Sequence, residues 1–247
     1  NTPDVASRTA LQKKVSIRCH STYQKRPQLT VSFGSIGSDY SQIGGLSLNS
    51  VVEYSQNDEI ASLRIDDGKA NALSAAVIAE INDGLDRAAR ESRAIVIRGR
   101  EGIFSGGFDL KVIRGSDEGL KADMRKAGMQ LLKRLYLSHQ PIIFAVTGHA
   151  VAMGALLILA GDWRIGISGE FRIGLNETSI GLPLPIAGLE LARDRLEPTA
   201  LQRATINAEQ FSPANAAAIG YLDQVVEMSD FDSAVMEAAT RLGALDP

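Results

Sequence analysis

The chain has very few of the residues that form disulfides and metal sites. Cys19 is the only cysteine, so no disulfide can form within the chain. The three histidines and this cysteine do not fall at the spacing of zinc ligands. We therefore expect no disulfide and no bound metal.

Long apolar runs and a surplus of positive charge are also lacking. The longest apolar candidate, residues 150–160, is shorter than the about 20 residues that a membrane-spanning helix needs. The formal net charge is −3, so no overall basic field attracts nucleic acid or an anionic membrane. We expect neither a membrane nor a nucleic acid as partner.

The first 50 residues differ in composition from the rest. They contain six basic residues, two acidic residues and many serines and threonines. An acid-poor segment of this kind resembles a mitochondrial transit segment, although its helical amphipathicity is weak. A leader or a family-specific extension is the plainer interpretation. We expect a cytoplasmic protein, or a mitochondrial matrix protein if this segment directs import.

From residue 51 onward, strand-like and helix-like patterns alternate. This alternation predicts an α/β protein with a largely parallel sheet, formed by a core at residues 51–228 and a helical segment at 229–247. The predicted strands are residues 51–54, 60–65, 94–97, 142–146 and 163–167. The predicted helices are residues 74–90 with Ser74 as N-cap, 120–135, 150–160, 186–194, 198–207 and 230–243.

Two glycine-bearing turns follow predicted strands. Residues 104–110 read Phe-Ser-Gly-Gly-Phe-Asp-Leu, and residues 148–155 read Gly-His-Ala-Val-Ala-Met-Gly-Ala. Glycine lets a backbone turn sharply and approach a ligand, and free N–H groups at a helix start suit a developing oxyanion. Many loops between strands and helices need glycine for packing alone, so these turns do not establish a function by themselves. Neither turn fits a dinucleotide or P-loop motif.

A third segment places one carboxylate among apolar residues. Glu177 is followed by Ile180, Leu182, Leu184 and Ile186, with few charges nearby. Such surroundings desolvate a carboxylate, which raises its pKa and makes it a stronger base. The alternative is an ordinary solvated loop glutamate.

Together, the two turns and the Gly-Leu-Asn-Glu-Thr segment at 174–178 resemble the crotonase, or enoyl-CoA hydratase/isomerase, superfamily over about residues 51–228. The resemblance implies a spiral of ββα units with a helical C-terminal part, assembled as a homotrimer or hexamer. It implies an acyl-CoA thioester substrate and no separate cofactor, since CoA is part of the substrate. The thioester oxygen would lie between the backbone N–H groups of Phe108 and Met153, and Glu177 would be catalytic.

The resemblance also implies contacts with CoA and the acyl group. The turn at residues 69–73 resembles the turn whose backbone meets the adenine end of CoA. Lys69 either contacts phosphate there or is an ordinary solvated lysine of an exposed turn. Phe108 stands where the family has a smaller residue, so its ring either narrows the pocket or stacks on the thiol arm. The residues implied to bind substrate are Lys69, Ala70, Asn71, Ala72, Gly106, Asp109, Leu110, Gly154 and Leu156.

Leu156 stands where hydratases of this family carry a first glutamate. Hydration resembles a reaction for two carboxylates, whereas shifting a double bond needs only one base. The Δ3,Δ2-enoyl-CoA isomerases likewise have an aliphatic residue there, so the resemblance favours an isomerase. A one-glutamate hydratase and an acyl-CoA-binding protein without turnover are the alternatives. RNA binding, seen among relatives, has support only in the basic N-terminal segment.

Overall fold

The computed structural model describes residues 50–245, so the predictions for residues 1–49 lie outside the described part. A six-stranded sheet has the order β1-β2-β3-β5-β7-β9, in which β1 and β2 are antiparallel and all other pairs are parallel. Its strands are β1 (Val52–Asn57), β2 (Ile60–Ile65), β3 (Ala94–Arg98), β5 (Ile142–Val146), β7 (Trp163–Ile167) and β9 (Gln224–Val226). The predicted parallel α/β architecture is confirmed.

A second sheet was not predicted. Three short parallel strands form it in the order β4-β6-β8. They are β4 (Gly102–Ser105), β6 (Gly148–Val151) and β8 (Ile173–Gly174). The prediction of a helix from residue 150 is therefore wrong, because Ala150 pairs with Ser105 and Ile173 as part of β6. A short apolar run does not distinguish a buried strand from a helix.

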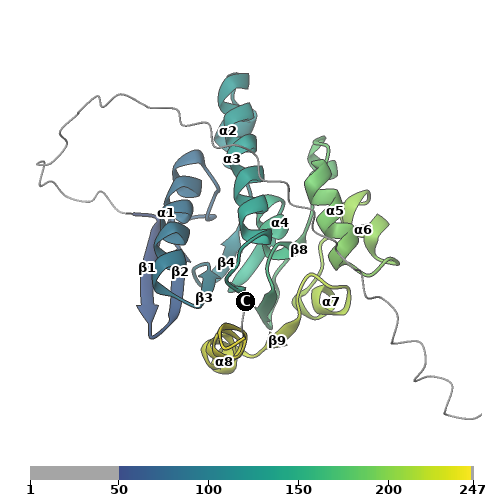
Figure 1. Cartoon of the computed structure of the whole chain (residues 1–247). Helices are drawn as coiled ribbons and strands as arrows, with labels where there is room; N and C mark the ends of the chain where they lie inside the picture. Colours follow the sequence, from purple (N-terminus) through teal and green to yellow (C-terminus); the bar gives the residue numbers. More distant parts are fainter. Residues whose placement is uncertain (1–49, 246–247) are drawn as a thin grey trace, which may run out of the picture. The chain divides into compact units, whose positions relative to one another are not determined.

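Helices connect the strands (Figure 1). Ser74 caps the first helix as predicted, since its Oγ accepts a hydrogen bond from the N–H of Val77 at 3.2 Å. The α-helices are α1 (Ala75–Glu91), α2 (Leu110–Arg114), α3 (Glu118–Tyr136), α4 (Met153–Leu159), α5 (Ile186–Arg195), α6 (Leu201–Thr205), α7 (Pro213–Ala218) and α8 (Phe231–Gly243). Two 3-10 turns are η2 (Thr178–Ile180) and η3 (Met228–Asp230).

The core lies on both faces of the six-stranded sheet. Along β3, Ile95 and Ile97 join a large apolar cluster with α1, α3 and α4, while Ala94 and Val96 join a smaller cluster with α8. This alternation is expected where successive side chains of a strand point to opposite faces. Figure 1 shows α8 away from the other three helices. The C-terminal helix therefore completes the fold by covering the second face.

None of the helices between residues 50 and 245 combines the length and apolar character needed to cross a membrane.

Candidate active site

The three-stranded sheet brings the three sequence motifs together. Phe108, Met153 and Glu177 follow the last residues of β4, β6 and β8 by three, two and three positions. The strands are parallel neighbours, so their carboxyl ends meet at one edge of the sheet. In α/β proteins, ligands bind at this edge of a parallel sheet. The small sheet, which the sequence did not indicate, is thus the frame of the candidate site.

The turns that carry Phe108 and Met153 touch each other. Gly107 has φ +91°, and a Cβ atom there would lie 2.9 Å from the Cβ of Ala152 and 3.2 Å from the nitrogen of Met153. The N–H of Phe108 has no acceptor among the described residues. Met153 begins α4, so its N–H has no acceptor within the helix. Two unpaired donors therefore lie on adjoining turns, as an oxyanion site requires.

Ala152 holds the second donor in an unusual conformation. Its φ of 50° and ψ of −127° are rare for a residue with a side chain. The N–H of Ala152 donates to the carbonyl of Gly174 in β8 at 3.1 Å, and its carbonyl accepts from the N–H of Leu156 at 3.0 Å. Backbone strain of this kind gathers at functional sites. Sequence reasoning missed Ala152 because alanine gives no indication of a positive φ.

The aromatic ring of Phe108 packs against α3. A Cβ atom at Gly128 of α3 would come within 2.4 Å of the Cζ of Phe108 and 3.4 Å of the Cε of Met153. The ring of Phe108 and the end of the Met153 side chain therefore both lie against α3 at Gly128. Both alternatives for Phe108, a narrowed pocket and stacking on the thiol arm, stay predictions. Gly128, which makes room for the ring, was not predicted from the sequence.

The turn at residues 67–72 is fixed by the carboxylate of Asp67. It accepts hydrogen bonds from the N–H groups of Lys69, Asn71 and Ala72 at 2.7, 2.8 and 3.0 Å. Burial alone would raise the pKa of Asp67, but the bonds from Ala72, Asn71 and Lys69 outweigh it and lower that pKa below its usual value. Asp67 is a third residue of the site region, after Ala152 and Gly128, that the motifs did not reveal.

Asn71 holds this turn in place and does not present its side chain to a ligand. Its amide nitrogen donates to the carbonyls of Ile65 at 2.8 Å and Phe104 at 3.1 Å, and Ser105 Oγ donates to the Asn71 carbonyl at 2.8 Å. Asn71 is completely buried and has φ 49°. The side chain of Asn71 thus joins β2 and β4 behind the turn, and the predicted contact of Asn71 with CoA through the backbone of this turn stays a prediction.

The turn also lies directly beside β4 and the Gly-Gly segment. The N–H of Gly106 donates to the carbonyl of Ala70 at 2.8 Å, and the N–H of Leu73 donates to the carbonyl of Gly107 at 2.8 Å. The side chain of Lys69 is exposed, and its carbonyl accepts a hydrogen bond from the guanidinium of Arg100. Two cationic residues thus flank the segment expected to meet CoA.

The remaining predicted contacts have distinct positions. Asp109 caps α2 by accepting from the N–H of Lys111 at 2.8 Å, and Leu110 is exposed at the start of that helix. Gly154 is buried, and a Cβ atom there would lie 2.6 Å from the carbonyl oxygen of Ser105. Gly154 is therefore needed for the close packing of α4 on β4.

Glu177 immediately precedes η2 and is 9% exposed. Its Oε2 atom is buried and has no hydrogen-bond partner among the described residues. Burial raises the pKa of Glu177, although the backbone N–H groups of Glu177 and Asn176 act in the opposite direction. The expectation of a desolvated carboxylate is confirmed. Two of the apolar residues that follow it, Ile180 and Ile186, are themselves 52% and 81% exposed.

Leu156, which the sequence aligns with the first glutamate of hydratases, lies inside the fold. It lies on α4, is 1% exposed, and packs against α5. A Cβ atom at Gly188 of α5 would lie 2.9 Å from the Cδ2 of Leu156 and 3.0 Å from its Cδ1. The absence of a side chain at Gly188 therefore makes room for the leucine side chain between α4 and α5.

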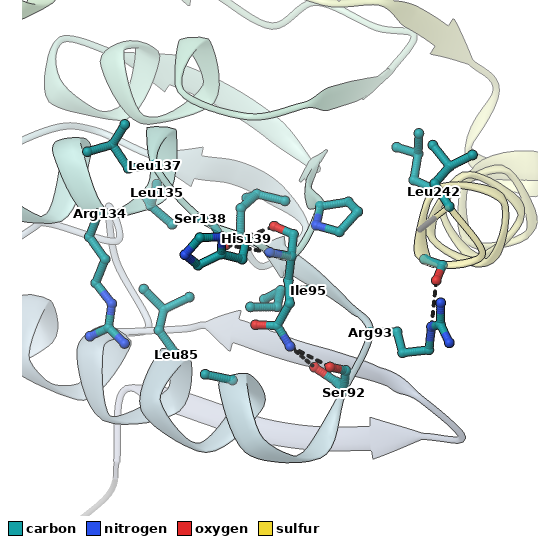
Figure 2. A pocket seen from close by; sticks show the side chains of 16 residues that line it. Leu85, Ser92, Arg93, Ile95, Arg134, Leu135, Leu137, Ser138, His139 and Leu242 are labelled. Carbon is teal, nitrogen blue, oxygen red and sulfur yellow. Dashed lines mark hydrogen bonds between the residues drawn. The ribbon is translucent and has the colours of Figure 1, made fainter. Parts of the chain in front are cut away.

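A cavity of about 760 Å³ lies at another place in the fold. Figure 2 shows Leu85, His139 and Leu242 among its lining side chains, which come from α1, the segment after α3, and α8. None of Phe108, Met153 and Glu177 lines it. The candidate active site is the place where Phe108, Met153 and Glu177 meet at the ends of β4, β6 and β8, and this cavity is not part of it. Residues 50–245 hold no cluster of three or more histidine, cysteine, aspartate or glutamate side chains suited to a metal ion.

The chain is similar to known enoyl-CoA hydratases and isomerases. The family model described as enoyl-CoA hydratase/isomerase matches residues 55–245. Human mitochondrial enoyl-CoA delta isomerase 1 is 30% identical over 203 residues, covering 79% of this chain and 66% of the relative. A probable enoyl-CoA hydratase of Mycobacterium avium is 30% identical over 199 residues, covering 77% of this chain and 75% of the relative.

The crystal structure of an enoyl-CoA hydratase/isomerase family protein from Pseudomonas syringae has a TM-score of 0.77 and 42% identity, covering 79% of this chain and 85% of that one. This likeness confirms the predicted crotonase fold. The chain spans slightly less than two thirds, 66%, of the length of the human isomerase. The motifs, the fold and the extent of the family match together show that the chain belongs to the enoyl-CoA hydratase/isomerase family.

Proposed function

We propose that this protein shifts the double bond of a 3-enoyl-CoA to the C2 position, with Glu177 as the only base. The observation that carries the proposal is the arrangement at the carboxyl ends of β4, β6 and β8. Two unpaired N–H groups, of Phe108 and Met153, adjoin one another there, and the one motif carboxylate is buried. The enoyl-CoA hydratase/isomerase family, to which the chain belongs, acts on acyl-CoA thioesters.

The reaction needs one proton to move. The Glu177 carboxylate takes a proton from C2, and the electrons pass to the thioester oxygen to give a dienolate. The same carboxyl group then delivers the proton to C4, and the new double bond forms between C2 and C3. A base of this kind contributes on the order of 10²–10⁴ in rate. Burial, which raises the pKa of Glu177, strengthens it as a base.

The N–H groups of Phe108 and Met153 stabilise the dienolate by donating to its oxygen. Because Ala152 already fixes the peptide before Met153, little reorganisation is needed when negative charge develops. Loss of one such donor costs ~10²–10³ in rate. The turn of residues 69–72 is proposed to contact the adenine end of CoA through its backbone.

Leu156 makes isomerisation a better candidate than hydration. Adding water calls for a second group that holds the water and transfers its proton. A buried leucine has no such group, and α4 carries no titratable side chain. Leu156 packs on Gly188, and we expect its apolar side chain to keep water from the dienolate.

The proposal is tested by measuring two reactions on one preparation. We expect conversion of 3-enoyl-CoA to 2-enoyl-CoA and little hydration of 2-enoyl-CoA. Efficient hydration of 2-enoyl-CoA by a protein that leaves 3-enoyl-CoA unchanged would instead support a hydratase. The similarity to a probable mycobacterial hydratase is the observation that favours this second candidate.

A protein that binds acyl-CoA without turnover would show neither reaction. Calorimetric titration with a non-reactive saturated acyl-CoA separates this case from a failed preparation. Binding without either reaction would contradict the enzymatic proposal while retaining the ligand class.

A further inference from the structure

The hydroxyl group of Ser105 joins two turns of the candidate site. Ser105 is the last residue of β4 and is completely buried. Its Oγ donates a hydrogen bond to the carbonyl of Asn71 at 2.8 Å and accepts one from the N–H of Gly107 at 3.1 Å. Asn71 belongs to the turn proposed to meet the adenine end of CoA, and Gly107 directly precedes the proposed oxyanion donor Phe108. One buried atom therefore contacts both turns.

Gly107 depends on its neighbours for a fixed conformation. Its φ of +91° is readily adopted by glycine, but glycine can also adopt many other conformations. The N–H of Gly107 is held by Ser105, and its carbonyl accepts a hydrogen bond from the N–H of Leu73 at 2.8 Å. Both peptide units that flank this glycine are thus held by hydrogen bonds.

These two bonds set the direction of the Phe108 N–H. A peptide unit is planar, and in its trans form the N–H points away from the carbonyl. The carbonyl of Gly107 and the N–H of Phe108 belong to one such unit, so the bond from Leu73 to the carbonyl directs the N–H to the opposite side. The bond between Gly107 and Ser105 fixes the preceding peptide unit. The proposed donor therefore depends on both bonds for its orientation.

Packing on two sides holds Ser105 in this place. It pairs with Ala150 of β6. A Cβ atom built on Gly154 of α4 would lie 2.9 Å from the Cβ of Ser105 and 2.6 Å from its carbonyl oxygen. The backbone of Ser105 is therefore fixed by β6 and α4, and its hydroxyl lies between the carbonyl of Asn71 and the N–H of Gly107.

We propose that Ser105 is a positioning residue that couples the nucleotide end of CoA to the oxyanion site. Binding of the nucleotide restrains the turn at residues 69–72, and the hydroxyl of Ser105 passes this restraint to Gly107 and so to the N–H of Phe108. Binding energy from a remote part of the substrate then improves orientation at the reacting atoms, which raises kcat as well as affinity. The coupling rests on the proposed function, in which this turn contacts the adenine end of CoA.

The kinetic test compares two substrates in two proteins. One substrate is 3-enoyl-CoA, and the other is the 3-enoyl thioester of pantetheine, which has the same reacting atoms but no nucleotide. In the wild type we expect kcat to be about tenfold lower with the pantetheine thioester, the size of one hydrogen bond's net contribution. Ser105→Ala should lower kcat on 3-enoyl-CoA by a similar factor and should give nearly equal kcat for the two substrates.

A merely structural role of Ser105 predicts a different result. Ser105→Ala would then lower kcat on both substrates by the same factor and would leave their ratio as in the wild type. This outcome would overturn the inference. Equal kcat values for the two substrates in the wild type would overturn it as well, because no coupling would then exist to be lost.

Ser138→Ala is the matched control. The hydroxyl of Ser138 likewise donates to a backbone carbonyl and accepts from a backbone N–H, both of Gln140, at 2.8 and 3.2 Å. Ser138 lies between α3 and β5 and lines the cavity of Figure 2, away from the proposed donors. The ratio of the two kcat values should be the same in Ser138→Ala as in the wild type.

A second measurement does not depend on turnover. Adenosine 3′,5′-bisphosphate, the nucleotide end of CoA alone, is titrated into ¹⁵N-labelled protein, and the backbone N–H resonances of residues 69–72 report its binding. In the wild type we expect the Phe108 N–H resonance to shift with the same Kd and hydrogen exchange at the Gly107 amide to slow. In Ser105→Ala we expect binding at residues 69–72 without either response.

The wild-type titration decides the matter even if Ser105→Ala does not fold. Shifts at residues 69–72 that leave Gly107 and Phe108 unchanged would overturn the inference, and so would the lack of any shift at residues 69–72. If the wild type does not isomerise 3-enoyl-CoA but the NMR responses appear as expected, the proposed function fails and the coupling through Ser105 stands.

Discussion

Gly107 lies against the peptide nitrogen of Met153, at a distance of 3.2 Å for a Cβ atom built on the glycine. This contact joins the turn after β4 to the start of α4. Since Phe108 directly follows Gly107, the spacing of the two proposed donors depends on the absence of a side chain at this glycine. The relationship gives a direct means of disturbing the oxyanion site without touching either donor.

Gly107→Ala is expected to lower kcat by ~10²–10³, the effect of losing one oxyanion donor. The new Cβ would lie 2.9 Å from the Cβ of Ala152 and would separate the two turns. Steady-state kinetics on 3-enoyl-CoA measures the effect.

The matched control is Gly102→Ala. Gly102 has φ +80°, close to that of Gly107, but no atom lies within 4 Å of a Cβ built there. Gly102→Ala introduces the same backbone strain, that of an alanine at positive φ, but should lower kcat only slightly. Equal losses in the two variants would show that strain alone, and not the contact with α4, causes the effect.

Gly128→Ala is expected to destabilise the protein by about 1–3 kcal/mol, as overpacking does in a filled core. A Cβ atom there would come within 2.5 Å of two ring atoms of Phe108. The ring is rigid, so it cannot relieve this clash as the flexible end of an aliphatic side chain could. Removing the ring with Phe108→Ala should abolish the added cost of Gly128→Ala, so the two changes should be strongly non-additive. Urea unfolding of the two single variants and the double variant measures this coupling.

Gly119→Ala on the same helix serves as the control for helix propensity. A Cβ atom there would meet only a side-chain oxygen of Asp117, at 3.1 Å, and no aromatic ring, so the change should cost less than Gly128→Ala. Additive effects of Gly128→Ala and Phe108→Ala would contradict the packing described for the ring.

Glu177→Gln is expected to change the pH dependence of stability. The pKa of Glu177 is raised in the folded protein above its ordinary value of 4.5. Its contribution to stability is therefore fully present below pH 4.5 and is lost as pH rises through the folded pKa. Glutamine does not ionise, so the variant does not lose this stability. The Tm of the variant minus the Tm of the wild type should therefore increase as pH rises from about 4 to 8.

Thermal unfolding at several pH values measures this difference. Asp83→Asn, a change of the same kind on the exposed surface of α1, is a suitable control and should show no comparable gain. A Tm difference between Glu177→Gln and wild type that stays constant across this range would show that Glu177 is not desolvated in solution.

Much of the fold is encoded in patterns that a sequence displays. The strands of the large sheet are short apolar or alternating runs, and Ser74 stands where a helix cap is expected. Glu177 and the two glycine turns are identified by their order along the chain, which the family resemblance makes meaningful. These features depend on local residue choice, so they can be recognised from the amino-acid sequence alone.

The three-stranded sheet that supports the site cannot be recognised from the sequence in the same way. The strands β4, β6 and β8 have only four, four and two residues, too few for a periodic pattern. Ala152 has a positive φ imposed by its bonds to Gly174 and Leu156, and its side chain gives no indication of this. Such features arise from tertiary contacts.

The most direct test of the central claim is the rate of 3-enoyl-CoA isomerisation by Glu177→Gln, measured together with its affinity for a saturated acyl-CoA. Glutamine keeps the size of the side chain but cannot accept the proton at C2. We predict a loss of activity on the order of 10²–10⁴ with an unchanged Kd for the saturated thioester. Isomerisation at the wild-type rate by Glu177→Gln would contradict the assignment of Glu177 as the base.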